Sequence, residues 1–63
     1  MYNYEIIIEQ EKVKSNDLKQ IIKILKWLID KGYIVMFKSY RDNISTTIED
    51  DYDISMLEDN MEV

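Results

Sequence analysis

The chain contains no cysteine, no histidine and no proline, and it has a single glycine. Without cysteine it forms no disulfide, and without cysteine or histidine it lacks the ligands of the zinc sites that hold many small domains together. Nucleophilic catalysis by a cysteine, or by a serine with a histidine base, is excluded for the same reason. We therefore expect a protein that is not an enzyme and that uses no metal and no cofactor.

Long apolar runs and a basic leader are also missing. No stretch approaches the roughly 20 apolar residues that span a bilayer. Met1 to Gln10 carries two glutamates and lacks the basic start of a signal peptide. We expect no membrane association and a cytoplasmic location, in the source cell or in an infected host.

The 63 residues predict one domain, 1–63, in which residues 50–63 form an acidic C-terminal segment. A chain of this length buries only about 60% of its unfolded surface. Since it has no disulfide or metal to add stability, we expect stabilisation from a second copy or from a larger protein. The sequence thus favours a homodimer or a partner-bound subunit.

The net charge of −5 is unevenly distributed along the chain. All eight basic residues fall within residues 12–41, together with only two acidic ones. Residues 42–63 carry eight acidic residues and no basic residue. The molecule is therefore electrically bipolar, and its acidic end is the part that a basic partner would bind.

One helix is predicted between Ser15 and Gly32. Ser15 is suited to the N-cap, because its hydroxyl can accept from a free backbone N–H. Gly32 follows the last apolar position, where glycine most easily adopts the left-handed C′ conformation. The apolar stripe has helical spacing and consists of Leu18, Ile21, Ile22, Leu25, Leu28 and Ile29.

Three strands are predicted around this helix. Tyr2 to Gln10 alternates apolar and polar residues, Tyr33 to Tyr40 is apolar on both faces, and Ile44 to Glu49 alternates again. The residues 41–43 form a turn that joins the last two strands as a hairpin, and residues 11–14 form a polar connection to the helix. The fold class is therefore α+β: a β-α-β-β domain with one long helix on a three-stranded sheet, the two strands beside the helix being parallel. The face of the sheet that points away from the helix is either exposed or covered by a second copy or a partner.

The C-terminal segment has two interpretations. Asp53 could cap a short helix that places Ile54, Leu57 and Met61 on one side. A segment this acidic could equally stay mobile until it meets a basic partner. Its acidic residues match several positions of a calcium loop, but Met56 occupies the position that requires glycine, so we expect no calcium site.

Trp27 lies nearly opposite the apolar stripe, among lysines. It could stack on a nucleic-acid base while the lysines bind phosphates, or serve as the anchor of a protein interface. It could also lie beneath the acidic segment. The residues alone leave these three interpretations open.

Acidic side chains on a small scaffold resemble an array of phosphates and fit a protein's nucleic-acid-binding surface. We therefore predict a non-catalytic, protein-binding DNA mimic, an inhibitor of the phage or virus type that occupies a basic surface of a host enzyme or defence protein. The predicted charged contacts are Glu49, Asp50, Asp51, Asp53, Glu58 and Asp59, with Trp27 and Tyr52 as aromatic anchors. Two alternatives are a structural or assembly subunit and a nucleic-acid-binding regulator that uses Lys19, Lys23, Lys26 and Trp27, although we do not expect direct nucleic-acid binding.

Overall fold

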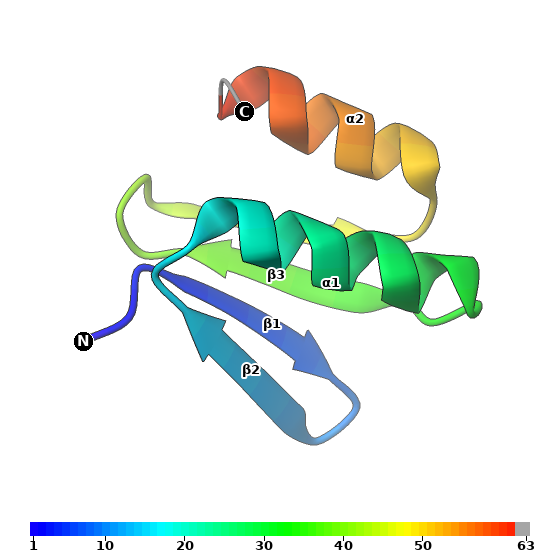
Figure 1. The fold of residues 1–63 in the computed structure, drawn as a ribbon, viewed down its shortest axis with the longest axis horizontal. Helices are drawn as coiled ribbons and strands as arrows, with labels where there is room; N and C mark the ends of the chain where they lie inside the picture. The colour runs from blue at the N-terminus through cyan, green and yellow to red at the C-terminus, as the bar shows by residue number, and fades with distance from the viewer. Residues whose placement is uncertain (62–63) are drawn as a thin grey trace.

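The computed structural model describes residues 1–61, so Glu62 and Val63 of the predicted acidic segment lie outside the described residues. Four strands and two helices follow one another along the chain (Figure 1). They are β1 (Tyr4–Ile8), β2 (Glu11–Ser15), α1 (Leu18–Asp30), β3 (Val35–Ser39), β4 (Ile44–Ile48) and α2 (Asp51–Asn60). The α+β class is confirmed.

The sheet has four strands rather than the three expected, in the order β2-β1-β3-β4, and all neighbouring pairs are antiparallel. The additional strand is β2, which forms a hairpin with β1 where the sequence predicted a polar connection. Because β2 runs back along β1 before α1 begins, β3 returns antiparallel to β1. The parallel crossover predicted from the sequence is therefore wrong, whereas the predicted β3–β4 hairpin is confirmed.

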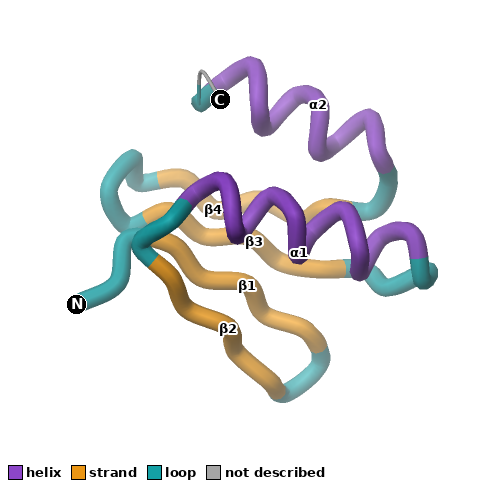
Figure 2. The backbone as a smooth tube through the Cα atoms, in the orientation of Figure 1, coloured by secondary structure: helices purple, strands orange, loops and turns teal. Residues whose placement is uncertain are grey.

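Both helices cover the same face of the sheet, and the core lies between the two layers (Figure 2). The buried stripe of α1 packs against alternate residues of the central strands, including Ile6 and Phe37, which lie opposite each other in the β1–β3 register. Four of the six predicted stripe residues are buried and the other two are half-buried. The amphipathic pattern of α1 therefore predicted its packed side correctly.

The two ends of α1 are fixed by different residues. The N-cap is Asp17 rather than Ser15: its Oδ1 accepts from the backbone N–H groups of Lys19 at 3.0 Å and Gln20 at 3.3 Å. Ser15 lies two residues earlier, where its Oγ accepts from the N–H of Asp17. At the other end Gly32 has φ +93°, and its N–H donates to the carbonyl oxygen of Ile29 at 2.9 Å, as predicted for a C′ glycine.

Asp17→Ala is expected to lower the free energy of unfolding by about 0.5–2 kcal/mol, because two N–H groups at the start of α1 lose their acceptor. Urea unfolding followed by circular dichroism measures this loss. Asp17→Asn keeps an acceptor oxygen at the same position and should cost much less. An equal loss in both variants would show that the capping hydrogen bonds do not stabilise the helix.

The C-terminal segment forms α2, a helix of ten residues, which is longer than the short helix expected. Its N-cap is Asp50, whose Oδ1 accepts from the N–H of Asp53 at 3.0 Å. The predicted apolar side is confirmed, since Ile54 and Leu57 are buried and Met61 is half-buried against the core. This side docks α2 beside α1 and over β4.

The opposite face of the sheet is covered by neither helix, because both helices pack on the other side. We call it the open sheet face. The strand register places eight side chains on it: Glu5, Ile7, Lys12, Lys14, Met36, Lys38, Ser45 and Thr47. Within the same residues, neither helix has the length and apolar character required to cross a membrane.

Candidate functional site

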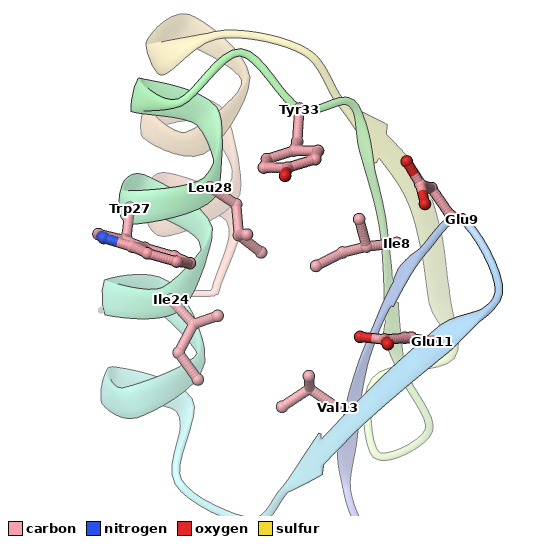
Figure 3. A pocket seen from close by; sticks show the side chains of 8 residues that line it. All are labelled: Ile8, Glu9, Glu11, Val13, Ile24, Trp27, Leu28 and Tyr33. Carbon is pink, nitrogen blue, oxygen red and sulfur yellow. The ribbon is translucent and has the colours of Figure 1, made fainter.

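An open groove lies between α1 and the β1–β2 hairpin, with a cavity volume of about 450 Å³ (Figure 3). We call it the Trp27 groove. Ile24, Trp27 and Leu28 line it from α1, and Tyr33 closes one end. The hairpin supplies the opposite wall, which consists of Ile8, Glu9, Glu11 and Val13.

The two walls of the Trp27 groove differ in chemistry. Aliphatic side chains from both walls point into it, while the carboxylates of Glu9 and Glu11 stand on the hairpin side (Figure 3). Trp27 lies on α1 with 58% of its surface exposed. The groove can therefore take an apolar group at its centre and a cation at its acidic side.

The indole of Trp27 already carries a cation on its surface. Lys31 Nζ lies 5.1 Å from the ring centroid, within the range of a cation–π interaction. One turn of α1 brings these two side chains together. The contact shows that the ring is accessible to a positively charged group and is not enclosed by the protein.

Glu9 occupies the tight turn between β1 and β2 in a left-handed conformation, with φ +54°. For a residue other than glycine this conformation costs roughly 1 kcal/mol. Glycine or asparagine would adopt it more easily. The turn therefore holds a carboxylate at the groove at a cost in stability, which is a pattern typical of functional positions.

Comparison with known proteins gives no match to this chain: no protein-family model, no curated protein and no solved structure matches it.

The acidic residues predicted as partner contacts fall into two groups. Three of them have structural partners: Asp50 caps α2, Asp53 Oδ2 accepts from the N–H of Glu49 at 2.8 Å, and Glu58 Oε1 lies 3.5 Å from Lys26 Nζ. Asp50 and Asp53 fix the start of α2, and Glu58 pairs with α1. Asp51 and Asp59 are exposed on α2 and have no ion-pair partner among residues 1–61, nor does the exposed carboxylate of Glu49.

The exposed part of α2 also carries two large apolar side chains. Tyr52 is 70% exposed and Met56, one turn later, is 44% exposed. We call the exposed side of α2 the acidic α2 surface, which consists of Asp51, Tyr52, Ser55, Met56 and Asp59. It is the part of the predicted acidic surface that remains available to a partner.

The two predicted aromatic anchors do not form one surface. Lys26 reaches Glu58 of α2, whereas Trp27, one residue further on, lines the groove beside the hairpin. In Figure 3, α2 lies behind α1, and Trp27 is on the near side. The interpretation that placed Trp27 beneath the acidic segment is therefore wrong, and Trp27 and Tyr52 belong to separate surfaces.

The sequence does not reveal the hairpin wall of the groove. It places Glu9 at a strand end and Glu11 in a polar connection, so their position opposite Trp27 could not be predicted. The alternation of Lys12, Val13 and Lys14 was the available signal for β2. Among residues 1–61 no group of acidic side chains is arranged to hold a metal ion.

Proposed function

We propose that the chain is a small non-catalytic protein-binding module whose partner presents a basic surface. The observation that carries this proposal is the Trp27 groove, an apolar groove bordered by two carboxylates and an exposed tryptophan. Tryptophan is among the residues that most often dominate the energy of protein interfaces. The acidic α2 surface supplies a second region of the same charge.

The groove fits a segment that alternates apolar and basic side chains. An apolar side chain of the partner would lie between Ile24 and Val13, where it leaves water. The next basic side chain would then reach Glu9 or Glu11. A basic side chain near Trp27 would also take over the cation–π contact that Lys31 makes in the free chain.

The partner class we propose is a nucleic-acid enzyme or defence protein of a host cell, as expected for a phage- or virus-type inhibitor. Such proteins carry basic surfaces because they bind phosphates. A module with acidic surfaces can occupy such a surface in place of nucleic acid. Self-association as a homodimer remains part of the proposal, since the chain is short and its sheet ends in two outer strands.

The helix-based nucleic-acid regulator has less support from the arrangement of the lysines. Of the residues assigned to it, Lys26 is paired with Glu58, and the ring of Trp27 is beside Lys31. Lys19 and Lys23 are exposed on α1. We therefore favour protein binding for this side of the molecule.

Trp27 is the only tryptophan of the chain, so its fluorescence reports on the groove directly. A short peptide that alternates arginine and leucine is expected to shift the emission to shorter wavelength at about 50 mM salt, where charge pairs are least screened. Glu9→Lys with Glu11→Lys should weaken this binding about 10- to 30-fold, because two exposed ion pairs become repulsive contacts. Both residues are exposed, so the fold should be unchanged by circular dichroism.

The matched control is Asp51→Lys with Asp59→Lys, which changes the net charge by the same amount on the acidic α2 surface. It should weaken peptide binding only slightly if the groove is the binding site. If this control loses binding and the groove variant keeps it, the partner surface lies on α2. A peptide that alternates aspartate and leucine should not bind, and equal binding of both peptides would contradict the charge argument.

A further inference from the structure

The open sheet face carries a charge opposite to that of the whole chain. Three of its side chains are lysines, Lys12, Lys14 and Lys38, and Glu5 is its one carboxylate. The acidic α2 surface belongs to the helix layer, which covers the other side of the sheet. Glu49 follows β4, at the edge opposite to the lysines of β2. Since the screening length is about 8 Å at physiological salt, the lysines dominate the field at this face.

Glu5 is buried although no helix covers this face. It is only 3% exposed, lies between Lys14 and Lys38 in the register, and accepts a hydrogen bond at Oε1 from the Tyr40 hydroxyl at 2.8 Å. A carboxylate has about four lone-pair positions, so Tyr40 leaves most of its acceptor capacity unused. The side chain lines a second cavity of about 350 Å³, together with Met1, Tyr2, Lys14 and Tyr40.

Tyr40 is held at both ends and still exposes its ring. Its backbone N–H donates to the carbonyl oxygen of Asn3 at 2.8 Å, and its hydroxyl donates to Glu5. The hydrogen bond to Glu5 raises the pKa of Tyr40 above its ordinary value, with desolvation and the charge of Glu5 acting in the same direction. The phenol therefore remains a protonated donor at neutral pH, while 58% of the residue is exposed.

These features together fit an unpaired nucleotide better than a peptide. An exposed aromatic ring stacks on a base, lysines bind the phosphates, and a carboxylate accepts from the amino group of a base. A basic peptide would be repelled by the lysines, and an acidic peptide would bring a carboxylate against Glu5. Two open sheet faces placed against each other would bring lysines against lysines.

We propose that the open sheet face binds single-stranded nucleic acid, with a base stacked on the exposed face of the Tyr40 ring and its amino group donating to Glu5, and with phosphates on Lys12, Lys14 and Lys38. A duplex cannot bind in this way, because its paired bases can neither stack on the Tyr40 ring nor reach the Glu5 carboxylate. The proposal is independent of the Trp27 groove, which lies on the other side of the sheet. Failure of either proposal leaves the other intact.

Fluorescence anisotropy of labelled oligodeoxycytidine tests the proposal on the full chain. Three phosphate contacts predict a salt slope of about −2, so the affinity should fall about 20-fold between 50 and 200 mM salt. Lys14→Glu with Lys38→Glu should abolish binding. Lys19→Glu with Lys23→Glu makes the same change of net charge on exposed positions of α1 and should retain most of it.

The stacking and the base contact are tested separately. Tyr40→Ala should weaken binding roughly 5- to 150-fold, the range measured for one stacked base, and Tyr40→Phe should retain more affinity because the ring remains. Oligodeoxycytidine should bind about fivefold more tightly than oligothymidine, and Glu5→Gln should reduce this preference. Circular dichroism of each variant confirms that the sheet is intact.

Several outcomes would overturn the proposal. One is that single strands do not bind at about 50 mM salt. Another is that the two double variants, Lys14→Glu with Lys38→Glu and Lys19→Glu with Lys23→Glu, lose the same amount of affinity. Equal affinity for cytosine and thymine tracts would show that Glu5 does not contact the base. If polyglutamate binds this face while oligonucleotides do not, its partner is an acidic protein surface or the acidic α2 surface of a second copy.

Discussion

Phe37→Ala is expected to lower the free energy of unfolding by about 3–5 kcal/mol, a larger loss than Asp17→Ala should cause. Phe37 is fully buried at the centre of the sheet, opposite Ile6, and its ring stacks on that of Tyr4 with 6.3 Å between the centroids. Removing such a ring costs about 3–5 kcal/mol. At about 0.05–0.15 kcal/mol per residue, a chain of this length has only about 3–9 kcal/mol of total stability. One substitution therefore removes at least about a third of this stability and, at the lower end of the range, all of it.

Urea unfolding of the wild type and the far-ultraviolet spectrum of the variant measure this effect. Thr46→Ala is the control, because Thr46 lies directly opposite Phe37 in the β3–β4 register but is exposed. It should change stability by less than about 1 kcal/mol. A folded Phe37→Ala variant with an unchanged urea midpoint would show that the core does not depend on this ring.

Trp27→Ala is expected to weaken binding of the arginine–leucine peptide about 30-fold or more. Tryptophan residues at the centre of an interface commonly contribute about 2 kcal/mol or more. Here the substitution removes the aromatic wall of the groove and the ring that accepts a cation. Because the side chain is more than half exposed in the free chain, the loss of stability should be small. A large functional effect is therefore combined with a nearly unchanged fold.

Anisotropy of a labelled peptide measures this binding, since the fluorescent residue itself is removed. Tyr52→Ala provides the matched control, an exposed aromatic residue taken from the acidic α2 surface. Its affinity for the peptide should equal that of the wild type. Should Tyr52→Ala lose binding while Trp27→Ala keeps it, the functional surface is the acidic α2 surface and not the Trp27 groove.

The helix α1 and the β3–β4 hairpin could be predicted from the sequence because their signals are local, whereas α2 is one of two interpretations that the sequence leaves open for its segment. The apolar stripe of α1 and the glycine at its end both act within a few residues, and Ile54 and Leu57 mark the packed side of α2. The choice between Ser15 and Asp17 as N-cap could not be made in this way. Both side chains bond at the helix start, and only the geometry shows which one caps it.

The strand β2 could not be predicted because it lies at an edge and buries little. Val13 is its single apolar residue, and the lysines on either side of it resemble a polar connection. Missing this one strand also reversed the predicted direction of β3 relative to β1. The Trp27 groove depends on the same strand, so its acidic wall could not be anticipated either.

The two edges of the sheet differ, and this difference limits how copies of the chain can join. The outer strand β2 carries Lys12 and Lys14, whose charges oppose alignment with the same strand of a neighbour. The other outer strand, β4, has Ser45, Thr46 and Thr47 and no charge. If two copies paired through β4, that edge would be occupied in both copies, and only the lysine-bearing β2 strands would remain at the outside. Growth by strand addition would then end at two chains, and such pairing would oppose fibril formation in a concentrated solution.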